Sequence, residues 1–274
     1  MLRSWTLADT GAVGPTPQLC HPERSRSSGG ERDLALLWPC AKAKLYHYLL
    51  ALVVASCFLS ASGSLAAQDV SFRGRVDVVH RSKRKSGSAD VVVWLTPLQP
   101  VDTPPPAHLA RLVQKDKRFT PHVIAIRVGS EIEFPNQDPF FHDVFSIYRG
   151  KPFDLGLYES GSSRKVRFSQ PGVSYIFCNI HPEMSAAVVA VPTPYFAVTG
   201  SDGSFQIGHL PPGRYKMEFW YELASEAELG SLAQTVGISA DAAPTTVTLH
   251  SSDISAPHFN KYGQEYSPEK PKSY

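Results

Sequence analysis

Short runs of β-branched and aromatic residues recur along the chain from Val70 onwards, with turn-forming residues between them. The chain contains 23 prolines and 19 glycines, which favour tight turns and disfavour long helices. The runs are VSFRGRVDVV (70–79), ADVVVWL (89–95), HVIAIRV (122–128), EIEFPN (131–136), HDVFSI (142–147), KVRFS (165–169), VSYIFC (173–178), AAVVAV (186–191), FAVTG (196–200), SFQIGHL (204–210), RYKMEFWYE (214–222), QTVGIS (234–239) and TTVTL (245–249). This series of short strands predicts an all-β protein built from β-sandwiches.

The residues before this series form two stretches that do not follow the strand pattern. Residues 1–41 contain an arginine- and serine-rich stretch, HPERSRSSGGERD, and we interpret them as unstructured sequence that follows a mis-assigned start. Residues 42–67 begin with two lysines, continue as an apolar run and end in small residues, which is the order of a secretory signal peptide. We therefore expect an exported, periplasmic protein. The alternative is a lipoprotein, in which acylation of Cys57 would attach the chain to a membrane.

The cysteines and the net charge limit the classes of protein. Of the four cysteines, Cys20, Cys40 and Cys57 lie in the two leading stretches, so the exported chain would contain Cys178 alone. This excludes an internal disulfide framework. A lone thiol in an oxidising compartment is reactive unless another group occupies it. The formal net charge of +2 gives no indication of a nucleic-acid partner.

Three potential metal ligands occur in one short segment, CNIHPEM. Cys178, His181 and Met184 are spaced at i, i+3 and i+6 between the end of one apolar strand and the start of the next. A tight loop between two rigid strands can direct all three side chains to one point, and Pro182 stiffens that loop.

His142 is the fourth candidate ligand, because it begins its own predicted strand after the loop PNQDPFF. Each of the four residues taken singly is more typical of a structural role. Together they provide two imidazoles, a thiolate and a thioether, which is the donor set of a blue-copper electron-transfer site. Zinc is the alternative metal, but a thioether is a poor zinc ligand.

These residues resemble the cupredoxins, the plastocyanin- and amicyanin-like blue copper proteins. The spacing C-x2-H-P-x-M is similar to the ligand loop of amicyanin-type members, and VGSEIEFPNQDPFFHDVFS is similar to the stretch that supplies their first histidine. The resemblance covers about residues 112–192. It implies a cupredoxin Greek-key β-sandwich with one type 1 copper ion, held by His142, Cys178, His181 and Met184. The wider arrangement looks like exported bacterial proteins of the methylamine-utilisation type.

The resemblance also implies roles for neighbouring residues. Asp143 stands where the family commonly has asparagine, whereas Asn179 follows the cysteine. We expect the backbone N–H of Asp143 to face the sulfur and the amide of Asn179 to link the two ligand-bearing loops, with Pro182 beside them. This departure leaves the reduction potential open.

The family resemblance further implies a route for electrons. In cupredoxins the second histidine of the ligand loop lies at the surface among apolar residues. We therefore expect His181 to serve as the electron port, surrounded by Phe140, Phe141 and Pro182.

A second module is predicted on either side of residues 112–192. The segments TGSDGSFQI and LPPGRY resemble the carboxypeptidase regulatory-like (CnaB-type) β-sandwich, which is Ig-like, and its opening strands precede the copper domain. The predicted organisation is a discontinuous sandwich, residues 69–100 and 193–250, with the cupredoxin domain inserted and a polar tail over 251–274. One enlarged sandwich with a shared core is the alternative. We find no catalytic constellation in this module and expect a scaffold or docking surface.

The sequence as a whole predicts an exported mononuclear copper protein that transfers electrons to and from unidentified redox partner proteins. No open coordination position is evident, so we expect no enzyme activity. Two alternatives remain open. One is a copper carrier or storage protein without redox turnover, and the other is an exported carbohydrate- or partner-binding sandwich with a degenerate metal loop.

Overall fold

The computed structural model describes residues 70–80, 87–103, 105, 109–147, 150–252 and 258–266. These residues fall within one compact unit, Leu65–Tyr274. Strands dominate the described part and are accompanied by one short helix, α2 (Glu226–Leu232), so the all-β prediction is confirmed. The residues interpreted as a mis-assigned start and a signal peptide lie outside the described residues, as do the first three cysteines. No helix in the described part is both long and apolar enough to cross a membrane.

The strands reproduce the predicted runs closely, and β1 and β14 have the predicted bounds. Four strands (β3, β4, β5 and β9) and the helix were not predicted. The strands are β1 (Val70–Val79), β2 (Val92–Pro97), β3 (Leu109–Arg111), β4 (Val113–Lys115), β5 (Arg118–Thr120), β6 (Val123–Arg127), β7 (Glu131–Pro135), β8 (His142–Ser146), β9 (Phe153–Tyr158), β10 (Ser163–Arg167), β11 (Gly172–Cys178), β12 (Ser185–Val191), β13 (Phe196–Val198), β14 (Ser204–Leu210), β15 (Gly213–Trp220), β16 (Gln234–Ile238) and β17 (Thr245–His250).

The strands β3–β12 pair only among themselves within the described part of the chain, and we call them the central sandwich. One sheet has the order β6-β12-β11-β8-β9, the other has the order β10-β7-β3, and β4 and β5 form a hairpin. Alternating apolar residues from both sheets form a common core that includes Ile132, Phe134, Val144 and Ile176. β11 pairs with β12 on one side and with β8 on the other, which places three chain segments side by side at the end of β11.

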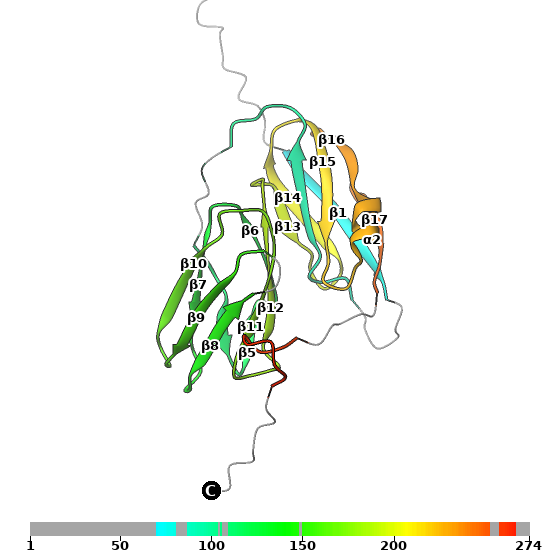
Figure 1. The fold of residues 1–274 in the computed structure, drawn as a ribbon. Coiled ribbons are helices and arrows are strands. Elements are labelled where there is room, and N and C mark those ends of the chain that lie inside the picture. Colours follow the sequence, from blue (N-terminus) through cyan, green and yellow to red (C-terminus); the bar gives the residue numbers. More distant parts are fainter. Residues whose placement is uncertain are drawn as a thin grey trace, which may run out of the picture. The chain divides into compact units, whose positions relative to one another are not determined.

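The strands β1, β2 and β13–β17 form a second sandwich. We call it the flanking sandwich, because its strands precede and follow those of the central sandwich in the sequence. Its sheets have the orders β14-β1-β17 and β13-β2-β15-β16. In Figure 1, β1 in cyan lies beside β17 in orange, and the two strands are parallel neighbours. Strands from both ends of the described chain therefore complete the same sheets. The domain boundaries given above stay a prediction.

A hairpin turn in the flanking sandwich shows why glycine is needed at the predicted Asp202–Gly203 turn. Gly203 has a φ of +80°, and a Cβ built on it would lie 2.2 Å from the carbonyl oxygen of Val76. Both the left-handed backbone and the close approach of β1 therefore require glycine. The turn fixes the start of β14 and its antiparallel pairing with β1.

A third apolar cluster combines residues of both sandwiches. Val123, Val189 and Val191 of the central sandwich are buried together with Val92 and Trp220 of the flanking sandwich. The two sets of sheets therefore have separate main cores and one shared cluster.

Candidate metal centre

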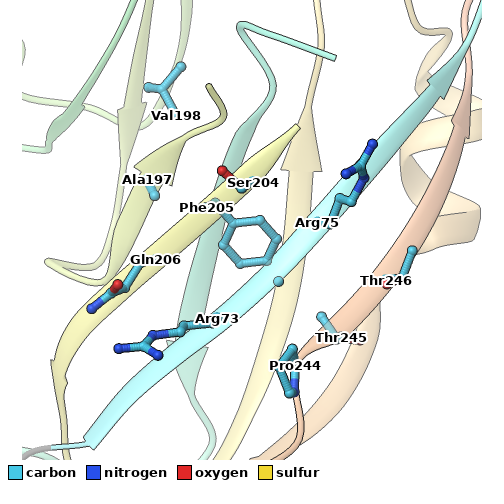
Figure 2. Close-up of a pocket in the computed structure, with 11 residues that line it drawn as sticks. Arg73, Arg75, Ala197, Val198, Ser204, Phe205, Gln206, Pro244, Thr245 and Thr246 are labelled. Atoms are coloured by element: carbon cyan, nitrogen blue, oxygen red, sulfur yellow. The ribbon is translucent and has the colours of Figure 1, made fainter. Parts of the chain in front are cut away.

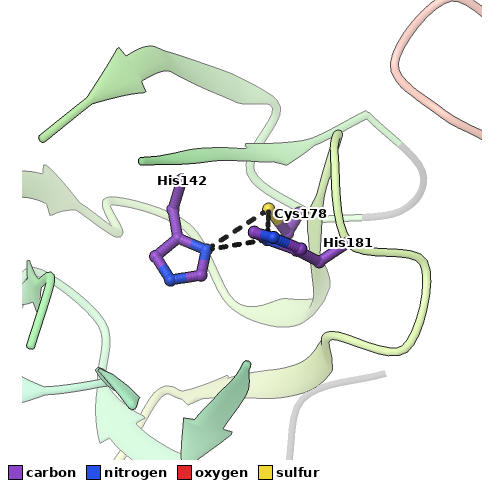
Figure 3. A group of neighbouring side chains, drawn as sticks. All are labelled: His142, Cys178 and His181. Atoms are coloured by element: carbon purple, nitrogen blue, oxygen red, sulfur yellow. Dashed lines mark hydrogen bonds between the residues drawn. The ribbon is translucent and has the colours of Figure 1, made fainter. Parts of the chain in front are cut away.

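Three of the four predicted ligands come together at the end of the central sandwich. His142 is the first residue of β8 and Cys178 is the last residue of β11, and the pairing of Cys178 with Val144 places these strand ends side by side. His181 follows in the loop between β11 and β12. Figure 3 shows the three side chains directed toward one another.

The distances among the three ligand atoms fit a single metal ion. The Sγ atom of Cys178 lies 3.7 Å from Nδ1 of His142 and 3.5 Å from Nδ1 of His181, and the two Nδ1 atoms are 3.1 Å apart. A point in the plane of this triangle lies about 2.0 Å from all three atoms, which is close to ordinary metal–nitrogen and metal–sulfur bond lengths. His142 and Cys178 are 0% exposed and His181 is 8% exposed. The dashed lines in Figure 3 therefore mark the spacing of three candidate ligands around one ion rather than hydrogen bonds that hold the side chains together.

Met184 lies in the same buried cluster as Cys178 and is fully buried. Its backbone closes the ligand loop: the N–H of Met184 donates to the carbonyl of His181 at 3.0 Å, and the N–H of Cys178 donates to the carbonyl of Met184 at 3.3 Å. These bonds define the loop that the spacing predicted, while Pro182 lies exposed in the middle of it.

A buried carboxylate that the sequence analysis did not single out holds His142. Oδ2 of Asp138 lies 2.9 Å from Nε2 of His142, and both side chains are almost completely buried. Because a carboxylate only accepts, Nε2 carries the proton and Nδ1 presents its lone pair toward Cys178. The motif N-x-D ahead of His142 was the available signal, since Asn136 and Asp138 fall in the stretch that resembles cupredoxins.

The turn of the β4–β5 hairpin binds the same carboxylate. The backbone N–H groups of Asp116 and Lys117 donate to Asp138 at 2.6 and 3.0 Å. Both turn residues have φ values of +53°, a conformation that is unfavourable for residues other than glycine. Burial raises the pKa of Asp138, but the bonds from Lys117, His142 and Asp116 outweigh burial and lower this pKa overall. The carboxylate is therefore charged and fixed.

Burial also sets the protonation of the ligands themselves. It lowers the pKa of His142, although Asp138 opposes this effect, so the imidazole is neutral and can ligate. Burial raises the pKa of the Cys178 thiol, and backbone N–H groups of Asp143, Ile180 and His181 oppose it. Binding a metal therefore requires Cys178 to lose its proton.

The side chains of Asp143 and Asn179 link the two ligand-bearing segments. Nδ2 of Asn179 donates to Oδ2 of Asp143 at 3.0 Å, which is the connection expected of these two residues. The carboxylate needs a positive partner, and Lys261 supplies it with Nζ 2.9 Å from Asp143 and 3.0 Å from Asp154.

Lys261 belongs to a C-terminal segment, residues 258–266, that packs against the ligand loop. We expected this segment to be part of a polar surface tail. Most of its residues are exposed, but His258 stacks on Phe177 with ring centroids 4.1 Å apart, and the hydroxyl of Tyr266 donates to the carbonyl of Cys178 at 3.0 Å. The sequence gives no indication of this contact of His258.

The proposed electron port has aromatic neighbours but little exposed imidazole. The ring centroid of Phe140 lies 5.4 Å from those of both His142 and His181. Phe141 is 50% exposed and Pro182 is exposed, whereas only 8% of the surface of His181 reaches solvent. The exposed apolar surface next to the ligands is therefore provided by Phe141, Ile180 and Pro182 rather than by the histidine.

The flanking sandwich has a surface hollow of about 430 Å³, but its chemistry does not suggest a metal site (Figure 2). Arg73 and Arg75 of β1 lie beside Phe205, and Arg75 is engaged by Asp77 at 2.6 Å. The lining contains no histidine, cysteine or carboxylate. Among the described residues, the only group of three histidine, cysteine or acidic side chains with ligand atoms this close is the one at His142.

Comparisons with known proteins give similarities of fold for part of the chain. No protein-family model matches the sequence, and no curated protein matches it. A purple cupredoxin from Nitrosopumilus maritimus is 22% identical with a TM-score of 0.28, over 30% of this chain and 99% of that one. A Cu-containing nitrite reductase from Thermus scotoductus SA-01 is 24% identical with a TM-score of 0.30, over 35% of this chain and 25% of that one. A reduced amicyanin mutant is 15% identical with a TM-score of 0.29, over 30% of this chain and 82% of that one.

Proposed function

We propose that this chain is an exported protein that holds one type 1 copper ion between His142, Cys178, His181 and Met184 and transfers single electrons. The observation that carries the proposal is the buried triangle of Nδ1, Nδ1 and Sγ atoms, 3.1 to 3.7 Å apart. A thiolate and a thioether beside two imidazoles favour copper over zinc.

Copper bound there would supply a one-electron step between Cu(I) and Cu(II). The protein's part is to keep the ligands in place during that step. Asp138 holds the Nδ1 lone pair of His142 toward the site, and the loop hydrogen bonds of Met184 hold the Cys178–His181 spacing. Four ligands in a buried site leave no obvious position for a substrate, so we propose that the protein has no enzyme activity of its own.

The finer assignments belong to the same proposal. We infer that the central sandwich is a plastocyanin- and amicyanin-like cupredoxin of the methylamine-utilisation type, and that the flanking sandwich is a carboxypeptidase regulatory-like scaffold. Export to the periplasm would follow from residues 42–67. Redox partner proteins would approach near Phe141, where an apolar side chain is exposed beside the ligands.

The test is to produce residues 68–274 in an oxidising compartment, load the protein with Cu(II), and measure metal content and the visible spectrum. We expect one copper per chain and an intense copper–thiolate charge-transfer band that disappears on reduction and returns on oxidation. Cys178→Ser should abolish the band. His181→Gln should abolish or strongly shift it, whereas the matched control His122→Gln should leave it unchanged.

The same experiment separates the alternatives. A protein that binds Cu(I) tightly but stays colourless with Cu(II) would be a carrier or storage protein. A chain that binds no copper under either condition would exclude the copper proposal and favour a partner-binding sandwich.

A further inference from the structure

We propose that residues 258–266 act as a clamp that holds the ligand loop in its metal-binding shape before the metal arrives and slows metal loss afterwards. This C-terminal clamp rests on the proposed function only for the identity of the metal. Its members are positioning residues, because they bind the backbone and the neighbours of the ligands.

The first contact of the clamp is with the ligand-bearing strand itself. The hydroxyl of Tyr266 donates to the carbonyl of Cys178 at 3.0 Å. This carbonyl belongs to the last residue of β11, where the sheet pairing of the strand ends. The Tyr266 hydroxyl therefore fixes the backbone at the point from which the thiol projects.

The second contact is with the middle of the ligand loop. The Nε2–H of His258 donates a hydrogen bond to the carbonyl of Pro182 at 2.9 Å, and the imidazole stacks on Phe177. The ring of Tyr266 meets the ring of His258 at 82° with centroids 5.3 Å apart. The imidazole of His258 therefore contacts both sides of the ligand loop, at Phe177 just before Cys178 and at Pro182 just after His181.

The third contact reaches the segment that carries His142. The backbone N–H of Lys261 donates to Oδ1 of Asn179 at 3.1 Å, and Nζ of Lys261 lies 2.9 Å from the carboxylate of Asp143. The Lys261 side chain is only 14% exposed and that of Asp143 only 8%. A partly buried ion pair of this kind is costly to open by removing one partner. Both ligand-bearing segments are therefore attached to the same short piece of chain.

The first test uses the metal-free protein and is independent of copper. Tyr266→Phe and Lys261→Met are compared with Tyr262→Phe, which removes a hydroxyl from a side chain of the same segment that is 71% exposed. We expect amide hydrogen exchange at Met184 and Asn179 to become about 2- to 10-fold faster in the two clamp variants, the effect of losing one hydrogen bond. Exchange in Tyr262→Phe should stay at the wild-type rate.

The second test uses the copper-loaded protein. Transfer of Cu(I) to a chelator should accelerate by a similar factor in both clamp variants. Lys261→Met should also shift the reduction potential downward, because the uncompensated Asp143 carboxylate would stabilise Cu(II), and Lys261→Arg should restore the potential. A merely structural role would not produce this shift with charge-dependent rescue.

The outcomes separate the clamp from the proposed function. Loop exchange in Tyr266→Phe and Lys261→Met equal to that in Tyr262→Phe would overturn the clamp even if copper binds normally. A chain that takes up no copper would overturn the proposed function, and the exchange measurement on the metal-free protein would still decide the clamp.

Discussion

The two sandwiches differ in what they bury. The main core of the flanking sandwich consists of apolar and tyrosine side chains such as Leu95, Leu210 and Phe219. The central sandwich has an apolar core of similar kind but also buries a group of polar side chains, most of them at the end that carries the ligands. They are Gln114, Ser130, Asn136, Asp138, His142, Asp143, Ser146, Ser174 and His181.

The difference identifies the end of the central sandwich at which a functional site is expected. Burying a polar group without a partner costs free energy, so such groups persist where a network satisfies them. Asp138 receives two backbone N–H groups and His142, and Asp143 receives Asn179 and Lys261. The flanking sandwich buries fewer polar side chains, among them Ser88, Thr199 and Ser251. The network of the central sandwich holds the predicted ligand His142 and the segment of Asp143 in place.

The comparison predicts that truncating the flanking core costs stability and leaves the metal site unchanged. Leu210 is fully buried, so Leu210→Ala should lower the free energy of unfolding by about 2 to 5 kcal/mol, through lost burial and a remaining cavity. Urea unfolding of the metal-free protein measures this loss. The charge-transfer band of the folded, copper-loaded variant should keep its position.

The control for this substitution is Leu98→Ala, because Leu98 is exposed and its truncation should change stability by less than about 0.5 kcal/mol. A shifted copper spectrum in folded Leu210→Ala would contradict the separation of the two regions.

A substitution in the polar network of the central sandwich should have the opposite effect: it should lower the metal affinity rather than the stability. In Asp138→Asn the new amide has only one accepting oxygen. The three donors that face it are the backbone N–H groups of Asp116 and Lys117 and the ring N–H of His142. If its NH₂ faces His142, the imidazole must accept at Nε2 and carry its proton on Nδ1, the atom that should ligate. We expect copper affinity to fall about 10- to 100-fold, as for other groups that orient a ligating histidine.

Competition with a chromophoric chelator measures that affinity, and ¹⁵N chemical shifts of the His142 ring in the metal-free protein report the tautomer directly. Asp77→Asn is the matched control, because Asp77 is a half-exposed carboxylate that pairs with Arg75 on β1 of the flanking sandwich. Wild-type affinity together with an unchanged His142 tautomer in Asp138→Asn would show that the carboxylate does not orient the ligand.

The sequence predicted much of the fold and the ligand segment because both depend on local patterns. Strands such as β1 and β14 have clear alternation, and Cys178, His181 and Met184 lie in one loop. The strands β3, β4 and β5 have three residues each, and each includes a charged residue, so none of them forms an apolar run. The run FDLGLY of β9 is interrupted by Gly156. The contacts of Asp138 with Asp116 and of Tyr266 with Cys178 depend on tertiary packing between segments that are distant in the sequence, so no local pattern indicates them.

The smallest expected effect on stability comes from an ion pair between the central and the flanking sandwich. Nε2 of His122, just before β6, lies 2.7 Å from Glu222, just after β15, and Nδ1 lies 3.1 Å from the carbonyl of Ser185. Both partners accept, so the doubly protonated imidazole fits best. The hydrogen bond to Glu222 raises the pKa of His122 above the ordinary value for histidine, against the opposing effect of burial, and Asp90 adds to the increase.

Because the pKa is raised on folding, the ion pair stabilises the protein fully below about pH 6.5, and its contribution is lost as the pH rises through the higher folded-state value. Both side chains are at least one third exposed, so we expect only about 0.2 to 1 kcal/mol. The measurement is the difference in unfolding free energy between wild type and His122→Gln across this pH range. In Glu222→Gln most of the pH dependence attributable to His122 should disappear. If it persisted at the wild-type size, Ser185 and Asp90 rather than Glu222 would be what raises the pKa of His122.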